Sequence, residues 1–288
     1  TIHGFYKEPE NTIETLFLGA STAVNAFTPM ELYEDYGICA YNLGTEQQPM
    51  LTSYYWLEEA YRFHSETLKN VVLECSMLRR TPQIAFYQKT IDHMKFSSIK
   101  YHAVKDYTED FHEMLLYLVP IFSYHKRWAS ITDVDFEIIN YKIKDYVRGY
   151  NFVTERYFNS EKYKESIISS YILDQEAEPA KFHQESLQYL EKIVNFCKEK
   201  GIRLILMKTP NINWSSSNHN AAAELAKNYK LDFLDFNFEP LSLEIDYNIL
   251  DIADIDGHMN YYGASKLTSW FGKYLSEQCN VTDVRGNP

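Results

Sequence analysis

Five short apolar runs, spaced along the chain and separated by helical patterns, limit most strongly how this sequence can fold. Each run is about five residues long, which is typical of a strand and too short for a buried helix. Strands that are apolar throughout need cover on both faces, and a parallel sheet between two layers of helices provides it. The runs lie at 15–19, 39–43, 71–75, 203–207 and 232–236.

The segments between these runs carry helix signals. Residues 28–31 combine a threonine N-cap, a proline at the first helical position and a glutamate at the third. Apolar residues keep helical spacing over 187–197, and Gly201 can end that helix. A last amphipathic helix follows Asn260. We therefore predict a single α/β domain over residues 1–288, built as a three-layer, doubly wound parallel sheet.

Residues from about 78 to 175 break this alternation. The segment is rich in Tyr, Phe, Lys and Glu, has a mostly helical pattern and contains no clear buried strand. We interpret it as an insertion between the third and fourth strands that forms a lid or one wall of a cleft.

The charge and the cysteines bear on partners. A formal net charge of −12 disfavours binding of nucleic acid, since a polyanion would be repelled overall. The net charge does not exclude a local basic pocket. The four cysteines lie far apart without the spacing of metal ligands. Cys75 and Cys197 fall in apolar patterns and indicate buried thiols. We expect neither a metal nor a cofactor.

Ser21 follows the first predicted strand in the sequence Gly19-Ala20-Ser21. Functional groups in α/β sheets gather where strands end, and a serine there exposes its hydroxyl beside free backbone N–H groups. A serine in this position is, however, more often a plain helix N-cap. The second strand ends at Gly44, whose N–H either faces the same turn or belongs to an ordinary loop.

His258 lies in an acidic segment, 251–260, with Asp254 and Asp256 nearby. A carboxylate that accepts from one ring nitrogen fixes the tautomer, so that the other nitrogen can take a serine proton. The alternatives for this segment are a solvated acidic loop or a weak metal site.

Taken in order, these pieces resemble the SGNH/GDSL hydrolase superfamily, and most closely the DltD-type extracellular acyl-transfer proteins of Gram-positive bacteria. The resemblance covers nearly the whole chain. It rests on Gly19-Ala20-Ser21, Tyr36-Gly37-Ile38, Tyr41-Asn42-Leu43-Gly44, Gln48-Pro49, 124–128, Asp135-Phe136, Lys208-Thr209-Pro210 and 258–264, which includes Asn260 and Gly263-Ala264.

The resemblance implies that Ser21 is a nucleophile, that His258 is its general base, and that the N–H groups of Ser21 and Gly44 form the oxyanion hole. The family's aspartate lies three residues before the histidine, where this chain has Ile255. Asp254 and Asp256 are the candidates for that role, and we favour Asp254, because a carboxylate one turn earlier can fold back onto the imidazole.

Two further departures from the family pattern concern positions expected to contact the oxyanion or the substrate. The third strand ends in 73–76, Leu-Glu-Cys-Ser, without the family's asparagine donor. Thr22 stands where relatives often have histidine. In the insertion, His125, Arg127 and Trp128 are candidate substrate-binding residues, since a cation beside an aromatic ring can bind a carboxylate, a phosphate or a sugar face. A buried Trp128 with Arg127 paired to an acid is the competing interpretation.

These features predict a serine-dependent esterase or O-acyltransferase that acts on acyl esters of a cell-surface polysaccharide or cell-wall polymer through an acyl-Ser21 intermediate. Its partners would be an acyl donor and water, a sugar or a polyol as acceptor. The alternative is a non-catalytic SGNH-like module that binds polysaccharide or a membrane-bound acyltransferase, and a weaker one is a metal-dependent phosphoesterase. By resemblance we expect an extracellular protein, anchored by a segment that precedes Thr1.

Overall fold

The computed structural model describes residues 2–119, 130, 132–133, 144–157, 172–211, 213–254 and 256–285. At its centre is a parallel sheet in the order β2-β1-β3-β4-β5. The predicted apolar runs all form strands, with ends that differ by a residue or two. The strands are β1 (Thr15–Leu18), β2 (Ala40–Asn42), β3 (Asn70–Glu74), β4 (Arg203–Lys208) and β5 (Asp232–Asp235).

This strand order is that of a flavodoxin-like, doubly wound sheet. The chain runs from β1 outward to β2 and then returns to place β3 on the other side of β1. Ligands of such sheets bind beyond the carboxyl ends of the strands at this reversal. The fold therefore directs attention to the residues that follow β1, β2 and β3.

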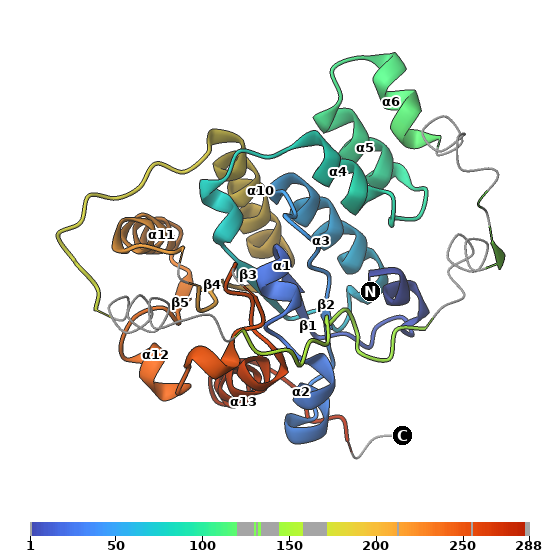
Figure 1. Ribbon diagram of the computed structural model, residues 1–288. Helices are drawn as coiled ribbons and strands as arrows, with labels where there is room; N and C mark the ends of the chain where they lie inside the picture. Colours follow the sequence, from blue (N-terminus) through green and yellow to red (C-terminus); the bar gives the residue numbers. More distant parts are fainter. Residues whose placement is uncertain are drawn as a thin grey trace.

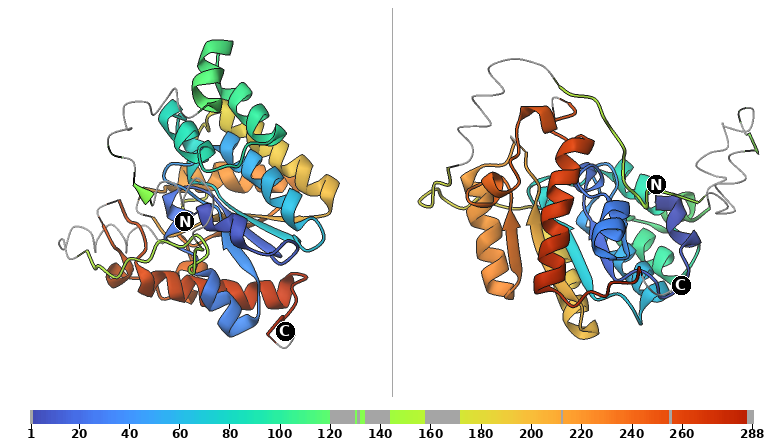
Figure 2. Two further views of the ribbon diagram at one scale, coloured as in Figure 1. Left: turned by 90° about the vertical axis from the view of Figure 1, so that its right-hand side faces the viewer. Right: turned by 90° about the horizontal axis from the view of Figure 1, so that it is seen from below.

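Helices cover both faces of the sheet, which confirms the predicted parallel α/β layers (Figure 1). One face is packed by α3 (Met50–His64) and α10 (Gln184–Lys200), with α11 (Ser216–Tyr229) beside them. The other is packed by α2 (Pro29–Tyr36) and α13 (Tyr261–Gln278). Figure 2 shows α13 running along its face of the sheet.

Side chains that alternate along β1 supply both cores. Leu16 and Leu18 pack with α3 and α10, whereas Phe17 faces the opposite core. There Phe17 stacks on Phe27 at 4.1 Å between ring centroids, and Phe271 of α13 closes the cluster. Because residues 16–18 of β1 are buried on both faces of the sheet, all three are apolar.

The predicted helix boundaries are confirmed. α2 begins at Pro29 after Thr28, α10 ends at Gly201 in the left-handed region (φ 69°), and Asn260 caps α13 by accepting from the amides of Tyr262 and Gly263. None of the described helices is long and apolar enough to span a bilayer. Cys75 and Cys197 are buried thiols, as predicted.

In its described part, the insertion begins with a 3-10 turn, η2 (Ser76–Arg79), and continues as α4 (Ile84–Ile91), α5 (Ser98–Tyr107) and α6 (Phe111–Leu118). Residues 144–157 are irregular and return along the carboxyl edge of the sheet, where the amide of Asn42 donates to Arg148 and that of Asn151 to Val24. Smaller elements are η1 (Ile2–Lys7), α1 (Ser21–Val24), α12 (Leu241–Glu244) and η4 (Ile249–Asp251).

Candidate active site

Ser21 is the first residue of α1, directly after the turn that ends β1. The turn requires Gly19, whose φ is 147° and whose missing side chain would come within 2.8 Å of the Glu74 Cβ at the end of β3. The close approach of the two strand ends fixes where α1 starts. It holds the Ser21 hydroxyl over the point where the strand order reverses.

The structure brings Ser21, His258 and Asp254 into a single line of contacts. Ser21 Oγ lies 2.7 Å from His258 Nε2, and His258 Nδ1 lies 2.7 Å from Asp254 Oδ2. A carboxylate only accepts, so a neutral imidazole in this contact carries its proton on Nδ1. Nε2 is then the acceptor for the serine proton, which is the arrangement of a general base.

Local backbone geometry selects Asp254 over Asp256. The segment folds back on itself between Ile252 and Met259, and the amide of Ala253 donates to the carbonyl of His258 at 2.8 Å. Asp254 Oδ1 also accepts from the amide of His258 at 3.2 Å, which orients the carboxylate toward the ring. Asp256 is exposed, and its own amide donates to Asp254 Oδ1. Asp254 is therefore the carboxylate that contacts the imidazole.

The two predicted oxyanion donors differ in whether their amides already have a hydrogen-bond acceptor. The amides of Ser21 and Thr22 have no acceptor among the described residues, as expected for the first residues of a helix. The amide of Gly44 lines the same cleft but donates to Asn42 Oδ1 at 3.0 Å. The prediction that Gly44 offers a free donor is therefore wrong for this conformation, because the Asn42 side chain forms a local turn two residues earlier. Thr22 is the adjacent donor that the sequence did not indicate.

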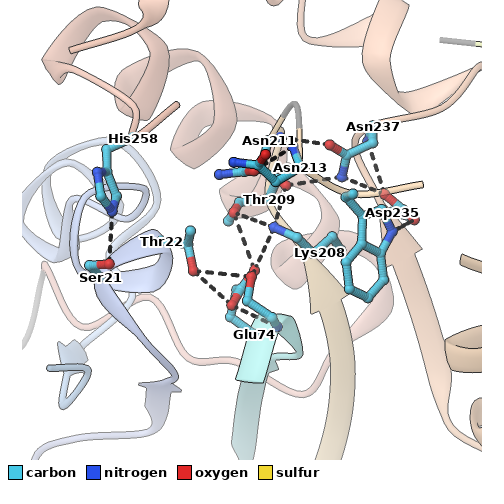
Figure 3. A network of polar contacts seen from close by, with 12 residues as sticks. Ser21, Thr22, Glu74, Lys208, Thr209, Asn211, Asn213, Asp235, Asn237 and His258 are labelled. Carbon is cyan, nitrogen blue, oxygen red and sulfur yellow. Dashed lines mark hydrogen bonds and ion pairs between the residues drawn. The ribbon is translucent and has the colours of Figure 1, made fainter. Parts of the chain in front are cut away.

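A second polar cluster lies next to the nucleophile, at the ends of β3 and β4 (Figure 3). Glu74 accepts from the hydroxyl of Thr22 at 2.8 Å, from the hydroxyl of Ser76 at 2.7 Å and from Lys208 Nζ at 2.8 Å. Lys208 Nζ also donates to the carbonyl of Thr209 at 2.8 Å. We refer to Thr22, Glu74, Ser76, Lys208 and Thr209 as the buried network.

The charges of the buried network compensate each other. Burial by itself raises the pKa of Glu74, but the charge of Lys208 and the hydrogen bonds from Lys208, Ser76 and Thr22 outweigh it. The pKa of Glu74 is therefore held below its usual value, and the side chain stays ionised. An ionised carboxylate accepts but cannot donate, so Glu74 does not replace the missing asparagine as an oxyanion donor. Its role is to hold Thr22, the residue after the nucleophile.

Both clusters border a cleft of about 790 Å³. The insertion contributes one wall, through residues of η2 and α4 and through the segment 149–151. Of the predicted substrate-binding residues, His125, Arg127 and Trp128 lie outside the described residues. The side chains that line the cleft near Ser21 include Thr45, Gln47, Ser76, Arg79, Arg80, Lys89, Asn151 and Asn211.

Asp254, Asp256 and His258 form the one group in the described part of the chain whose ligand atoms could share a metal ion, since these atoms lie within 4.8 Å of one another. Both ring nitrogens of His258 are already in contact, one with Ser21 and one with Asp254. A metal on either nitrogen would have to displace one of those contacts. The geometry thus favours proton transfer over metal binding at His258.

Comparison with known proteins gives no family. No protein-family model matches the chain, and no curated protein matches it in sequence. What the site can do therefore has to be argued from its own geometry.

Proposed function

We propose that this protein is a serine-dependent acyl-transfer enzyme, an esterase or O-acyltransferase of the SGNH type. The observation that carries the proposal is the continuous contact from Ser21 through His258 to Asp254, with 2.7 Å at each step. Contacts of this length are within the reach that proton transfer requires. The cleft beside Ser21 leaves room for an ester and an acceptor.

In the proposed reaction, Ser21 Oγ attacks the carbonyl carbon of an acyl ester while His258 Nε2 takes the hydroxyl proton. The tetrahedral intermediate collapses with cleavage of the bond to the leaving oxygen, which receives that proton from His258. An acyl-Ser21 ester remains. Water or a sugar hydroxyl then attacks it, and His258 removes the proton of the incoming group and returns it to Ser21.

Asp254 acts on the imidazole. Its carboxylate keeps the Nδ1 proton in place and stabilises the imidazolium that forms when His258 takes the serine proton. The amides of Ser21 and Thr22 are the donors available for the developing oxyanion. Since one oxyanion donor is worth about 10²–10³ in rate, we expect turnover of simple esters to be slow while the Gly44 amide stays on Asn42.

We propose a hydroxyl-rich polymer of the cell surface as the acceptor or substrate, with a small acyl group such as acetyl or alanyl. This part rests on the resemblance of the sequence to the SGNH and DltD-type proteins, and so does the proposed extracellular location. The second candidate is a non-catalytic module of the same fold. It is favoured by the engaged Gly44 amide and disfavoured by the short contact between Ser21 and His258.

Trapping of the acyl-enzyme tests the proposal. The protein is mixed with 4-nitrophenyl acetate, quenched in acid and digested, and the peptide that contains Ser21 is examined by mass spectrometry. The proposal expects one acetyl group on Ser21 and none in Ser21→Ala. Addition of glucose separates the two reactions, because a transferase forms acetylglucose whereas an esterase forms acetate alone. A protein that releases nitrophenol no faster than Ser21→Ala would contradict the proposal.

A further inference from the structure

Two adjacent arginines in the cleft wall form no ion pair within the described part of the chain. Arg79 ends η2 and Arg80 follows it, and both side chains line the cleft that contains Ser21. Neither forms an ion pair with any described residue, and Arg79 Nε is buried without a hydrogen-bond acceptor. A buried guanidinium N–H without an acceptor is costly, so this atom marks an unfilled position.

Two of the three carboxylates that line the cleft, Glu46 and Asp254, are held by other partners. Glu46 pairs with Lys89, and Asp254 contacts His258. Glu74 is compensated by Lys208 in the buried network. Asp256 lies in the His258 loop, where its carbonyl accepts from Asn211. None of these groups forms an ion pair with Arg79 or Arg80, and the charge of Glu74 offsets that of Arg79 only in part.

The electrostatics of the pair point the same way. Burial, and then the like charge of Arg80, lower the pKa of Arg79, which shows that the protonated form is disfavoured by its surroundings. In a chain of net charge −12, most surface positions would offer an acidic neighbour. Two adjacent arginines that instead line a cleft form a local positive site within an acidic protein.

The backbone ties the arginines to the nucleophile. Glu74 accepts from the amide of Ser76 at 3.1 Å and from the hydroxyl of Thr22 at 2.8 Å, so the start of η2 and the residue after Ser21 share one carboxylate. The four residues of η2 run from Ser76 to Arg79. An anion held by the arginines would therefore lie at a fixed place in the cleft relative to Ser21 Oγ.

We propose that Arg79 and Arg80 form an anion-binding subsite that selects, for the acyl-transfer site, a sugar substrate carrying a phosphate or a carboxylate. Guanidinium groups bind both anions through paired, charge-assisted hydrogen bonds. This inference rests on the proposed function for the reaction at Ser21, but binding of the anion itself does not require that reaction. Arg79 and Arg80 are thus specificity-determining residues rather than catalytic ones.

Three sugars that differ in charge test the subsite by isothermal titration calorimetry. Glucose 6-phosphate carries the phosphate, glucuronate carries the carboxylate, and glucose is the neutral control. For the wild-type protein we expect one or both anionic sugars to bind about tenfold to a hundredfold more tightly than glucose. The stronger of the two identifies the preferred anion.

Variants locate the effect. Arg79→Gln/Arg80→Gln should bind the anionic sugars no better than glucose, whereas Arg79→Lys/Arg80→Lys should keep part of the preference. Lys105→Gln/Lys198→Gln removes the same charge from exposed helix positions outside the cleft and should behave as wild type. Arg80→Gln alone changes an exposed side chain and provides a variant that should fold normally. Equal binding of all three sugars, or equal loss in the lysine control, would overturn the subsite.

A fluorophosphonate label on Ser21 separates this inference from the proposed function. Labelling of the wild-type protein, together with anion binding that is lost in Arg79→Gln/Arg80→Gln, supports both. Arginine-dependent anion binding without labelling of the wild-type protein would leave the subsite standing and reject acyl transfer. Labelling of Ser21 without a preference for the anionic sugars would support acyl transfer and reject the subsite.

Discussion

Two polar clusters meet at the carboxyl edge of the sheet, with similar contact lengths and very different surroundings. In the line of Ser21, His258 and Asp254, the side chain of His258 is 19% exposed and that of Asp254 is 46% exposed. In the buried network, Lys208 and Glu74 are 2% and 1% exposed across a contact of 2.8 Å. The first cluster is open to a substrate, and its groups can exchange protons with it. In the second, the charged pair is closed off from solvent and can only fix the positions of its neighbours, while Thr22 and Ser76 reach the cleft.

We infer that the open cluster of Ser21, His258 and Asp254 carries out the chemistry. The closed cluster, the buried network, holds the residues around it in place. Thr22 connects them, because it follows Ser21 in the chain and donates to Glu74. A change in the open cluster should therefore remove activity and leave stability intact. A change in the closed cluster should lower stability first and affect activity through Thr22.

The largest effect is expected within the open cluster, at the two aspartates. Asp254→Asn should lower kcat for 4-nitrophenyl acetate by about 10⁴-fold, because the amide no longer holds the Nδ1 proton of His258. Asp256→Asn is the matched control and should change kcat by about twofold or less, since that side chain is exposed. Equal losses in the two variants would show that Asp254 has no special role.

The next largest effect concerns the stability of the closed cluster. Lys208→Met leaves Glu74 buried without its cation, and we expect a loss of about 3–5 kcal/mol in the free energy of unfolding. Urea denaturation measures it. The double variant Glu74→Gln/Lys208→Met should lose less than the sum of the single variants, because neither partner is then left charged. A loss near zero in Lys208→Met would mean that the pair does not support the site.

The pH dependence of stability should also separate the clusters. The pKa of Glu74 is lower in the folded protein than in the unfolded chain, so its ionised form favours folding. This contribution is complete above the unfolded pKa of about 4.3 and is lost as the pH falls through the folded pKa. In acid titrations followed by circular dichroism, the stability of Glu74→Gln should depend less steeply on pH below that value than the stability of the wild-type protein. The stability of Ser21→Ala should show the wild-type pH dependence.

The smallest effect is expected where the clusters join. Thr22→Val keeps the shape of the side chain but removes its hydrogen bond to Glu74. We expect a loss of about 1–2 kcal/mol in stability, and a loss of several-fold in kcat with KM nearly unchanged. Thr45→Val, which removes a hydroxyl on the other side of the cleft, is the matched control and should spare kcat. A KM effect in Thr22→Val would instead indicate direct contact with substrate.

The sequence was sufficient to predict the parallel sheet, since each strand has an apolar centre and its polar residues lie only at the strand ends. It also pointed to Ser21 and His258, which lie at the end of β1 and just before α13. The engagement of Gly44 could not be predicted, because it depends on whether the Asn42 side chain or the cleft takes that amide. This competition is decided by the local geometry of the loop, which the residue pattern does not specify.

The pairing of Glu74 with Lys208 was also beyond the sequence pattern. The two residues are 134 positions apart and meet only because β3 and β4 are neighbours in register. The family resemblance includes Lys208-Thr209-Pro210 but assigns no role to these residues. The useful signal in hindsight is a charged residue at the very end of an otherwise apolar strand, since two such residues of opposite sign can pair when their strands are adjacent.

The most direct test of the account is covalent labelling of Ser21. The wild-type protein, Ser21→Ala, His258→Ala and Asp256→Asn are each incubated with a fluorophosphonate probe, and the intact masses are measured. We expect a single adduct on Ser21 in the wild-type protein and in Asp256→Asn, and none in the other two variants. A folded wild-type protein that stays unlabelled, under conditions that label a control serine hydrolase, would contradict the assignment of an activated serine.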